Sequence, residues 1–221
     1  KISISIVMRA QLALGLFGRF ESPTSGSSPA ARSMGLLSTS SGLPVLTEYT
    51  ISEGQHFCLP RIFKIRNKPE RVSWYIVFGE NADYDLQDED QQDWNKLCGL
   101  FYNFLNTRDS TVMVGWRYNQ KTQRMELNGY YHVDKGRDFT KPLLDVALGE
   151  PVRVDIRVDY AQKNYTVQLT RVNDGTLAKN SMPFTHDHTS CMEINTYFGG
   201  NEAAPQDITI YKAYAESEGG K

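Results

Sequence analysis

The feature that most constrains this chain is a strict alternation of apolar and charged residues that begins at Val152. Alternate positions carry apolar or aromatic side chains, and Arg or Asp stands at each position between them; the apolar set is Val152, Val154, Ile156, Val158 and Tyr160. A side-chain period of two is that of a β-strand with one buried face. A second alternating run, 164–172, follows after three residues. The two runs therefore predict an antiparallel hairpin.

Apolar, β-branched and aromatic runs recur along most of the chain, separated by turn signals such as Asn67-Lys68-Pro69-Glu70 and Asp134-Lys135-Gly136. These runs cover 57–65, 72–78, 94–105, 111–118, 124–133, 191–198 and 208–214. Few helical periods of any length occur after residue 45. Many short strands at hairpin spacing predict an all-β fold, an antiparallel β-sandwich or jelly roll.

The N-terminal part of the chain has a different composition. Residues 1–20 are apolar but are interrupted by Arg9, Gln11 and Arg19, so the uninterrupted apolar run is too short to span a bilayer. Residues 22–41 are rich in Ser, Gly, Pro and Ala, which is typical of a flexible linker. We expect a flexible or non-native N-terminal segment over 1–42 and a jelly-roll domain over 43–217.

Charge and cysteine content exclude some classes of function. The chain has 24 Lys and Arg against 26 Asp and Glu, a formal net charge of −2, which gives no electrostatic case for nucleic acid or for an anionic membrane surface. The three cysteines, Cys58, Cys98 and Cys191, form no CxxC pair that would indicate a zinc site. One disulfide with one buried thiol, or three buried thiols, are both compatible with this spacing.

The strand 124–133 offers a candidate ligand-binding face. One side of it is apolar, and the other carries polar or amphipathic side chains: Arg124, Glu126, Asn128, Tyr130 and His132. Planar hydrogen-bonding groups can bind sugar hydroxyls, and an aromatic ring can stack on the apolar face of a sugar; we expect Trp116 or Tyr118 on the neighbouring strand to be that ring. The alternative is an ordinary solvated face of an antiparallel sheet.

Two clusters could bind a metal ion. Asp83, Asp85 and Asp88 belong to an acidic segment that lacks the glycine and final glutamate of a helix–loop–helix calcium site. An irregular Ca²⁺ loop and a solvated, mobile loop both fit this segment. His186 and His188 could form a metal pair, but no third ligand is evident, and a surface loop is the alternative.

Three segments, 93–99, 114–119 and 197–208, resemble secreted or surface-attached bacterial proteins of the concanavalin A-like lectin/glucanase superfold. The resemblance covers roughly residues 45–215. It implies a jelly roll, a polysaccharide or glycan as partner, and a secreted or cell-surface location. It does not imply one activity, because this superfold hosts lectins, glycan-binding modules, hydrolases and lyases.

The enzyme patterns of the superfold are only partly present. Tyr197-Phe198 is similar to the Tyr-Phe-Lys-Ala-Gly strand of alginate-lyase-like members, but Gly199-Gly200 replaces Lys-Ala. Their Arg-x-Glu-x-Arg and Gln-[Ile/Val]-His strings, and the Glu-x-Asp-x-x-Glu string of laminarinase-like members, do not occur in the sequence.

The leading hypothesis is therefore non-catalytic polysaccharide binding, without a cofactor. The alternative is a polysaccharide lyase or glycoside hydrolase in which Tyr130 and His132 act as acid and base and Arg124 neutralises a uronate. A structural or adhesive surface domain is the third hypothesis. The glycan and the oligomeric state stay open.

Overall fold

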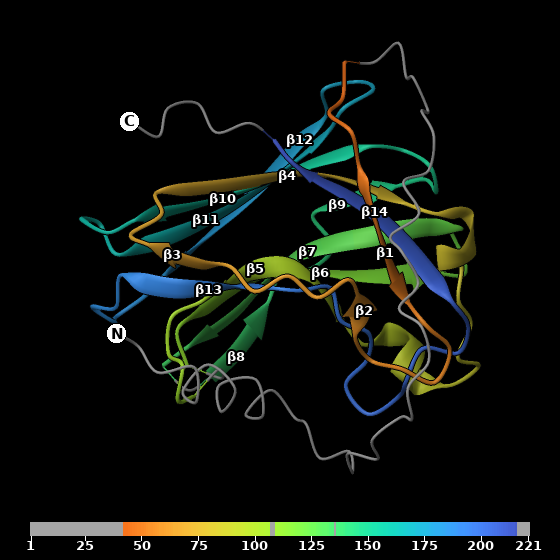
Figure 1. Ribbon diagram of the computed structural model, residues 1–221, viewed down its shortest axis with the longest axis horizontal. Coiled ribbons are helices and arrows are strands. Elements are labelled where there is room, and N and C mark those ends of the chain that lie inside the picture. The colour runs from red at the N-terminus through yellow and green to blue at the C-terminus, as the bar shows by residue number, and fades with distance from the viewer. Residues whose placement is uncertain (1–41, 107–108, 135, 216–221) are drawn as a thin grey trace, which may run out of the picture.

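The computed structural model describes residues 42–106, 109–134 and 136–215, and these form two antiparallel β-sheets packed face to face (Figure 1). The all-β sandwich predicted from the alternating runs is thereby confirmed. The predicted N-terminal segment lies outside the described residues except for Gly42. No helix within the described ranges is long and apolar enough to cross a membrane.

Sheet A has seven strands in the order β12-β11-β10-β4-β14-β1-β2. Their bounds are β1 Thr47–Ile51, β2 Cys58–Leu59, β4 Arg71–Phe78, β10 Val152–Asp159, β11 Asn164–Arg171, β12 Leu177–Pro183 and β14 Ile208–Tyr214.

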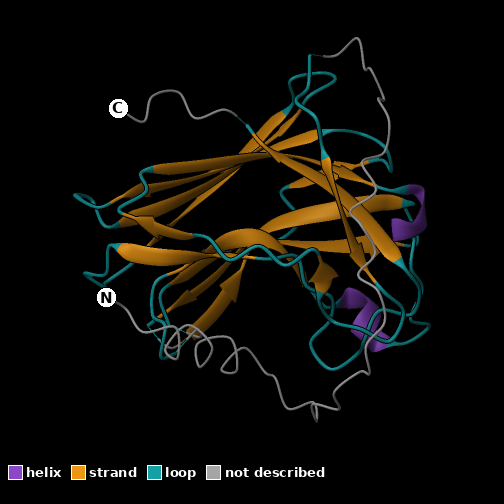
Figure 2. Ribbon diagram, viewed as in Figure 1, coloured by secondary structure: helices purple, strands orange, loops and turns teal. Residues whose placement is uncertain are grey.

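Sheet B runs in the order β3-β13-β5-β6-β7-β8, and β9 adds to β7. The bounds are β3 Ile65–Asn67, β5 Asn95–Phe101, β6 Thr111–Asn119, β7 Arg124–Val133, β8 Gly136–Phe139, β9 Leu144–Val146 and β13 Ser190–Ile194. Two short 3₁₀ helices, η1 Glu80–Ala82 and η2 Glu89–Gln92, stand in the acidic segment between β4 and β5 (Figure 2).

The two hairpins predicted most directly from alternation are present. β10 pairs with β11 from Val152↔Arg171 to Asp159↔Asn164, and β6 pairs with β7 along its whole length. Burial follows the expected period, because Val152, Val154, Ile156 and Val158 all face the core while the charged residues between them face outward.

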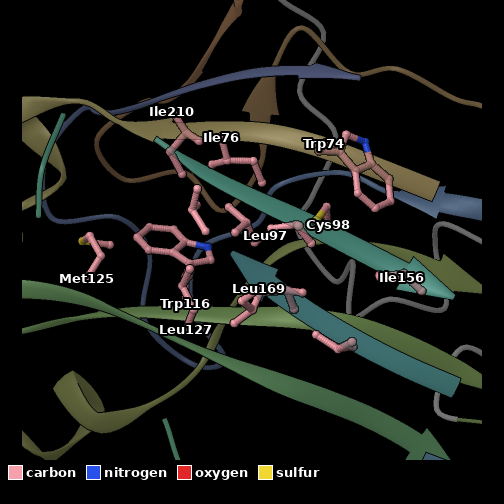
Figure 3. Close-up of a cluster of buried hydrophobic side chains, with 14 of the residues drawn as sticks. Trp74, Ile76, Leu97, Cys98, Trp116, Met125, Leu127, Ile156, Leu169 and Ile210 are labelled. Atoms are coloured by element: carbon pink, nitrogen blue, oxygen red, sulfur yellow. The ribbon is translucent and has the colours of Figure 1, made fainter. Parts of the chain in front are cut away.

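The core fills the space between the two sheets. Side chains of sheet B such as Leu97 and Leu127 meet side chains of sheet A such as Ile76 and Ile210 (Figure 3). All three cysteines are buried and free, which is the second of the two arrangements that the spacing allowed.

The prediction of one strand over 57–65 is wrong. β2 has only two residues, residues 60–64 have no regular structure, and β3 then begins at Ile65 in the other sheet. Pro60 has no N–H to donate to a sheet, so a continuous strand cannot pass through this position as a central strand. The segment 60–64 instead carries the chain from the edge of sheet A to the edge of sheet B.

The two strands of the 191–214 region belong to different sheets. β13 pairs with β5 and β3 in sheet B, whereas β14 pairs with β4 and β1 in sheet A. The chain turns between these strands at Gly199, which has φ +84°. A Cβ there would lie 1.8 Å from the carbonyl oxygen of Glu202, so glycine is required.

The apolar run 191–198 does not place its alternate side chains on one face throughout. Met192 and Ile194 lie on the outer face of sheet B, whereas Thr196 and Phe198 point into the core. β13 ends at Ile194, and the opposite strand β5 shifts register between Lys96 and Cys98, so the period of two is interrupted at this point.

Candidate functional site

Strand β7 alternates as the sequence predicts. Met125, Leu127 and Tyr131 belong to the core between the sheets. The predicted ligand residues therefore stand on the opposite side of β7, the outer face of sheet B. The contacts of these residues decide whether a ligand could reach them.

Glu126 is held by its neighbours on β6. Its carboxylate accepts a hydrogen bond from Arg117 Nε at 2.8 Å and another from Asn119 Nδ2 at 2.6 Å. The Arg117 guanidinium also lies 4.3 Å from the centre of the Trp94 ring. Glu126 is thus part of an ion-pair network with both of its oxygens engaged.

Arg124 turns toward the edge of the sandwich. Its guanidinium pairs with Asp145 and lies 3.2 Å from Glu150. Arg124 and Tyr130 are six residues apart on one strand, a separation of about 20 Å at 3.3 Å per residue. The strand geometry therefore sets Arg124 apart from Tyr130 and His132, and its role as the group that neutralises a uronate stays a prediction.

The remaining three residues of the predicted face are buried. Asn128 is fully buried and donates to the carbonyl of Thr140 at 3.2 Å, and Tyr130 and His132 make an edge-to-face ring contact at 5.4 Å. Tyr130 also belongs to a second apolar cluster on the outer face of sheet B; its buried members are Phe101, Met113, Tyr130, Met192 and Ile194. Ligand binding by the five β7 residues stays a prediction.

The structure corrects the prediction that Trp116 or Tyr118 is an exposed ring on which a sugar could stack. Trp116 is fully buried in the core (Figure 3). Tyr118 belongs to the same core cluster and is 7% exposed. Trp116 pairs with Leu127 across the β6–β7 ladder, so both side chains point the same way, into the core. Neither ring can stack on a sugar bound to the outer face of sheet B.

A small pocket opens where the 57–61 segment meets β5 and β13. It has a volume of about 30 Å³, and its lining includes Phe57, Arg61, Lys96, Asn195 and Tyr197. The pocket is too small to enclose a sugar ring, since it holds little more than one water molecule. A sugar would have to lie across its mouth.

Cations and aromatic rings are interleaved at this mouth. The ammonium of Lys96 lies 4.4 Å from the centre of the Tyr197 ring, and the guanidinium of Arg61 lies 4.0 Å from that of Phe57. His56 stacks on Tyr197 at 5.4 Å. Burial raises the pKa of Tyr197, so its hydroxyl stays protonated at neutral pH and can donate a hydrogen bond. The mouth is therefore rich in hydrogen-bond donors.

Asn195 fixes the geometry of the pocket wall. Its amide accepts from the N–H of Ile62 at 3.1 Å and donates to the carbonyl of the same residue at 2.9 Å. This pair of bonds ties the irregular 60–64 segment to the end of β13. Sequence reasoning placed Tyr197 and Arg61 in segments of interest but did not bring them to one pocket, because they are more than 130 positions apart in the chain.

The acidic segment does not assemble a calcium site in the described residues. Asp85 and Asp88 accept hydrogen bonds from the backbone N–H groups of Gln87 and Asp90, at 3.0 and 2.9 Å, and Asp83 lies 3.4 Å from Gln206 Nε2. Within the part of the chain that the structure describes, no group of three His, Cys, Asp or Glu side chains could hold a metal ion. The calcium prediction gains no support from this arrangement.

His186 belongs to an aromatic cluster at one end of the sandwich. Its ring stacks on Phe184 at 4.4 Å and on His188 at 5.5 Å, and its Nε2 is hydrogen-bonded to the hydroxyl of Tyr165. Burial, followed by the nearby His188, lowers the pKa of His186 to about 4. The half-buried imidazole is thus neutral at pH 7, engaged with aromatic partners.

We expect this imidazole to make stability depend on pH. Its pKa is lowered from about 6.5 in the unfolded chain to about 4 in the fold, so its contribution is complete above pH 6.5 and is lost as the pH falls toward 4. The melting temperature should therefore decrease across this window. His186→Phe, which keeps a ring against Phe184, should flatten that part of the profile; an unchanged slope would contradict the assignment.

The strand pairing and core define the class of protein: an antiparallel two-sheet β-sandwich with a donor-rich pocket at the outer edge of sheet B. No protein-family model matches the chain, and no curated protein matches it.

Solved structures do match. They include the alginate lyase AlyC3, at 8% identity over 77% of this chain and 75% of that one with a TM-score of 0.46. Peanut lectin matches at 10% identity over 80% and 95%, with a TM-score of 0.41. Full-length tailspike protein 2 of an Escherichia coli O157:H7 bacteriophage matches at 9% identity over 78% and 25%, also at 0.41.

The chain spans about a quarter of the tailspike chains and 65% of a glutamic peptidase chain that it also matches. The assignment of the fold rests on the strand pairing itself.

Proposed function

We propose that this chain binds polysaccharide without cleaving it, at the mouth of the pocket formed by Arg61, Lys96 and Tyr197. The observation that carries the proposal is the arrangement of polar groups around one surface pocket. Two cations, Arg61 and Lys96, each lie against an aromatic ring, and Tyr197 adds a hydroxyl. Charged donors form strong hydrogen bonds with oxygen ligands, and ordered side chains lose little entropy on binding. A secreted or cell-surface location is part of the same proposal.

The charges at the mouth favour an acidic glycan. Arg61 and Lys96 can only donate hydrogen bonds, and a carboxylate or sulfate group can only accept them. Glu193 also lines the pocket, but it is 8% exposed and is paired with Arg66 and with the hydroxyl of Tyr214. We therefore expect uronate- or sulfate-bearing polysaccharides to bind in preference to neutral ones.

The experiment is affinity electrophoresis against neutral and acidic polysaccharides, with a subsequent assay of the gel lanes for new reducing ends. Retardation by an acidic polymer without new ends is the expected result. New reducing ends would instead support the lyase or hydrolase hypothesis, and loss of that activity in His132→Ala would locate it on β7. No retardation by any polymer would contradict the proposal.

Replacement of Arg61 or Lys96 by Gln should weaken binding of the acidic polymer about tenfold each. Loss of a hydrogen bond to a charged group typically costs about 1.5–3 kcal/mol, and solvent exposure reduces that cost. Lys179 is an exposed lysine on edge strand β12 of the other sheet. Lys179→Gln is therefore the matched control, and this variant should bind the acidic polymer as the parent does. Equal affinities for all three variants would remove this pocket as the site.

A further inference from the structure

One edge of the sandwich exposes a strip that is both apolar and basic. It comprises residues 59–68, which cross from β2 to β3 and continue into the next turn, together with Tyr214 on β14. Its exposed apolar side chains are Leu59 at 65%, Ile62 at 41%, Phe63 at 50%, Ile65 at 50% and Tyr214 at 38%. These are five of the nine large hydrophobic side chains exposed among the described residues, so exposed apolar surface is concentrated here.

The strip also carries the largest run of positive charge in the sandwich sequence that no Asp or Glu interrupts. Between residues 56 and 69 there is no Asp or Glu, while Arg61, Lys64, Arg66 and Lys68 supply four positive charges. The formal net charge of −2 for the whole chain conceals this local excess. A partner that met this edge would encounter apolar tips flanked by cations.

Aromatic rings position three of these cations without neutralising them. The ammonium of Lys64 lies 4.0 Å from the centre of the Tyr214 ring, that of Lys68 lies 5.8 Å from Tyr160, and Arg61 lies over Phe57. A cation–π contact leaves the charge in place and its outward side available to an anion. Arg66 differs, because it is paired with the buried carboxylate of Glu193.

We propose that this basic–apolar strip binds the surface of an anionic phospholipid bilayer. In that position Leu59, Ile62 and Phe63 would enter the boundary between headgroups and acyl chains, and the lysines would lie at the level of the phosphates. Tyr214, half apolar and half polar, suits the same interfacial level. The proposal concerns peripheral binding at a surface that adjoins the glycan pocket and shares Arg61 with it.

Two alternatives fit the strip less well. In a two-fold symmetric contact with a second copy, Arg61, Lys64 and Lys68 would face the same three cations, and 56–69 carries no Asp or Glu to compensate them. A protein partner normally inserts an anchor side chain into a pocket, whereas the pocket at this end of the strip has only about 30 Å³. A bilayer requires no such pocket.

The test is co-sedimentation of the full chain with phosphatidylcholine vesicles that contain or lack phosphatidylserine. Binding should require phosphatidylserine and should weaken as the salt concentration rises. The double variant Ile62→Ser with Phe63→Ser should reduce the partition coefficient at least about tenfold, since burial of each side chain is worth more than one kcal/mol.

The matched control is Phe139→Ser with Leu177→Ser, which removes two exposed apolar side chains of similar size, 46% and 52% exposed, outside the strip. This control should sediment with vesicles as the parent does. Absence of binding to phosphatidylserine vesicles at low salt would overturn the proposal, as would equal losses in the two double variants. A dimer on gel filtration that Ile62→Ser with Phe63→Ser dissociates would assign the strip to a second copy instead.

Discussion

Replacement of Trp116 by Ala is expected to lower the free energy of unfolding by about 3–5 kcal/mol. The indole is fully buried, with its ring 5.7 Å from Phe78 and 5.9 Å from both Tyr84 and Phe198. Its Nε1–H also donates to the carbonyl of Lys96 at 3.1 Å. The substitution removes the apolar contacts, leaves a cavity between the sheets and removes the hydrogen-bond donor.

Denaturant unfolding followed by circular dichroism measures this loss without depending on tryptophan emission. Phe139→Ala is the control, because a ring that is 46% exposed should cost no more than about 1 kcal/mol. Below its melting temperature, the Trp116→Ala protein should still bind any glycan that the parent binds. A stable variant with lost glycan binding would contradict the placement of Trp116 in the core and restore it as a stacking platform.

Asp155→Ala is expected to cost about 2–4 kcal/mol, although this residue faces away from the core. Its carboxylate is 1% exposed and pairs with Arg71 at 2.6 Å and Arg153 at 3.1 Å, and it accepts a hydrogen bond from Ser73. Removing it leaves two neighbouring guanidinium groups and a buried hydroxyl without their shared acceptor. Both arginines are about one-third exposed, and their hydration limits the loss.

The measurement is again the free energy of unfolding from denaturant titration. Asp155→Asn keeps an acceptor for Ser73 and should fall between the parent and Asp155→Ala. Glu89→Ala, an exposed carboxylate in η2, should change stability by less than about 0.5 kcal/mol. A loss for Asp155→Ala as small as that for Glu89→Ala would show that the outer face of sheet A needs no charge cluster.

Local pattern predicted the sandwich because hairpins depend on short-range information. The β10–β11 hairpin was predicted from alternation over two runs separated by three residues, and the structure contains it. Alternation also separated the inner and outer sides of β7 correctly, because one side was clearly apolar and the other polar.

Pattern did not determine which side of β6 faces inward. Both of its alternating sets contain apolar residues, Trp116 in one and Met113 in the other, and both are buried, in the core and in the outer cluster respectively. Only the pairing of Trp116 with Leu127 selects the side, and that pairing depends on register. The error over 57–65 has a similar origin, since the apolar composition suggested a strand where the chain changes sheets.

By itself, the sequence determined the all-β class, the two long hairpins and the inward face of β10, since each follows from residues close together along the chain. Tertiary structure alone decided that β13 and β14 enter different sheets, that Trp116 belongs to the core, and that Arg61, Lys96 and Tyr197 line one pocket. The physical reason is that these outcomes depend on contacts between residues far apart in the chain, which local periodicity does not encode.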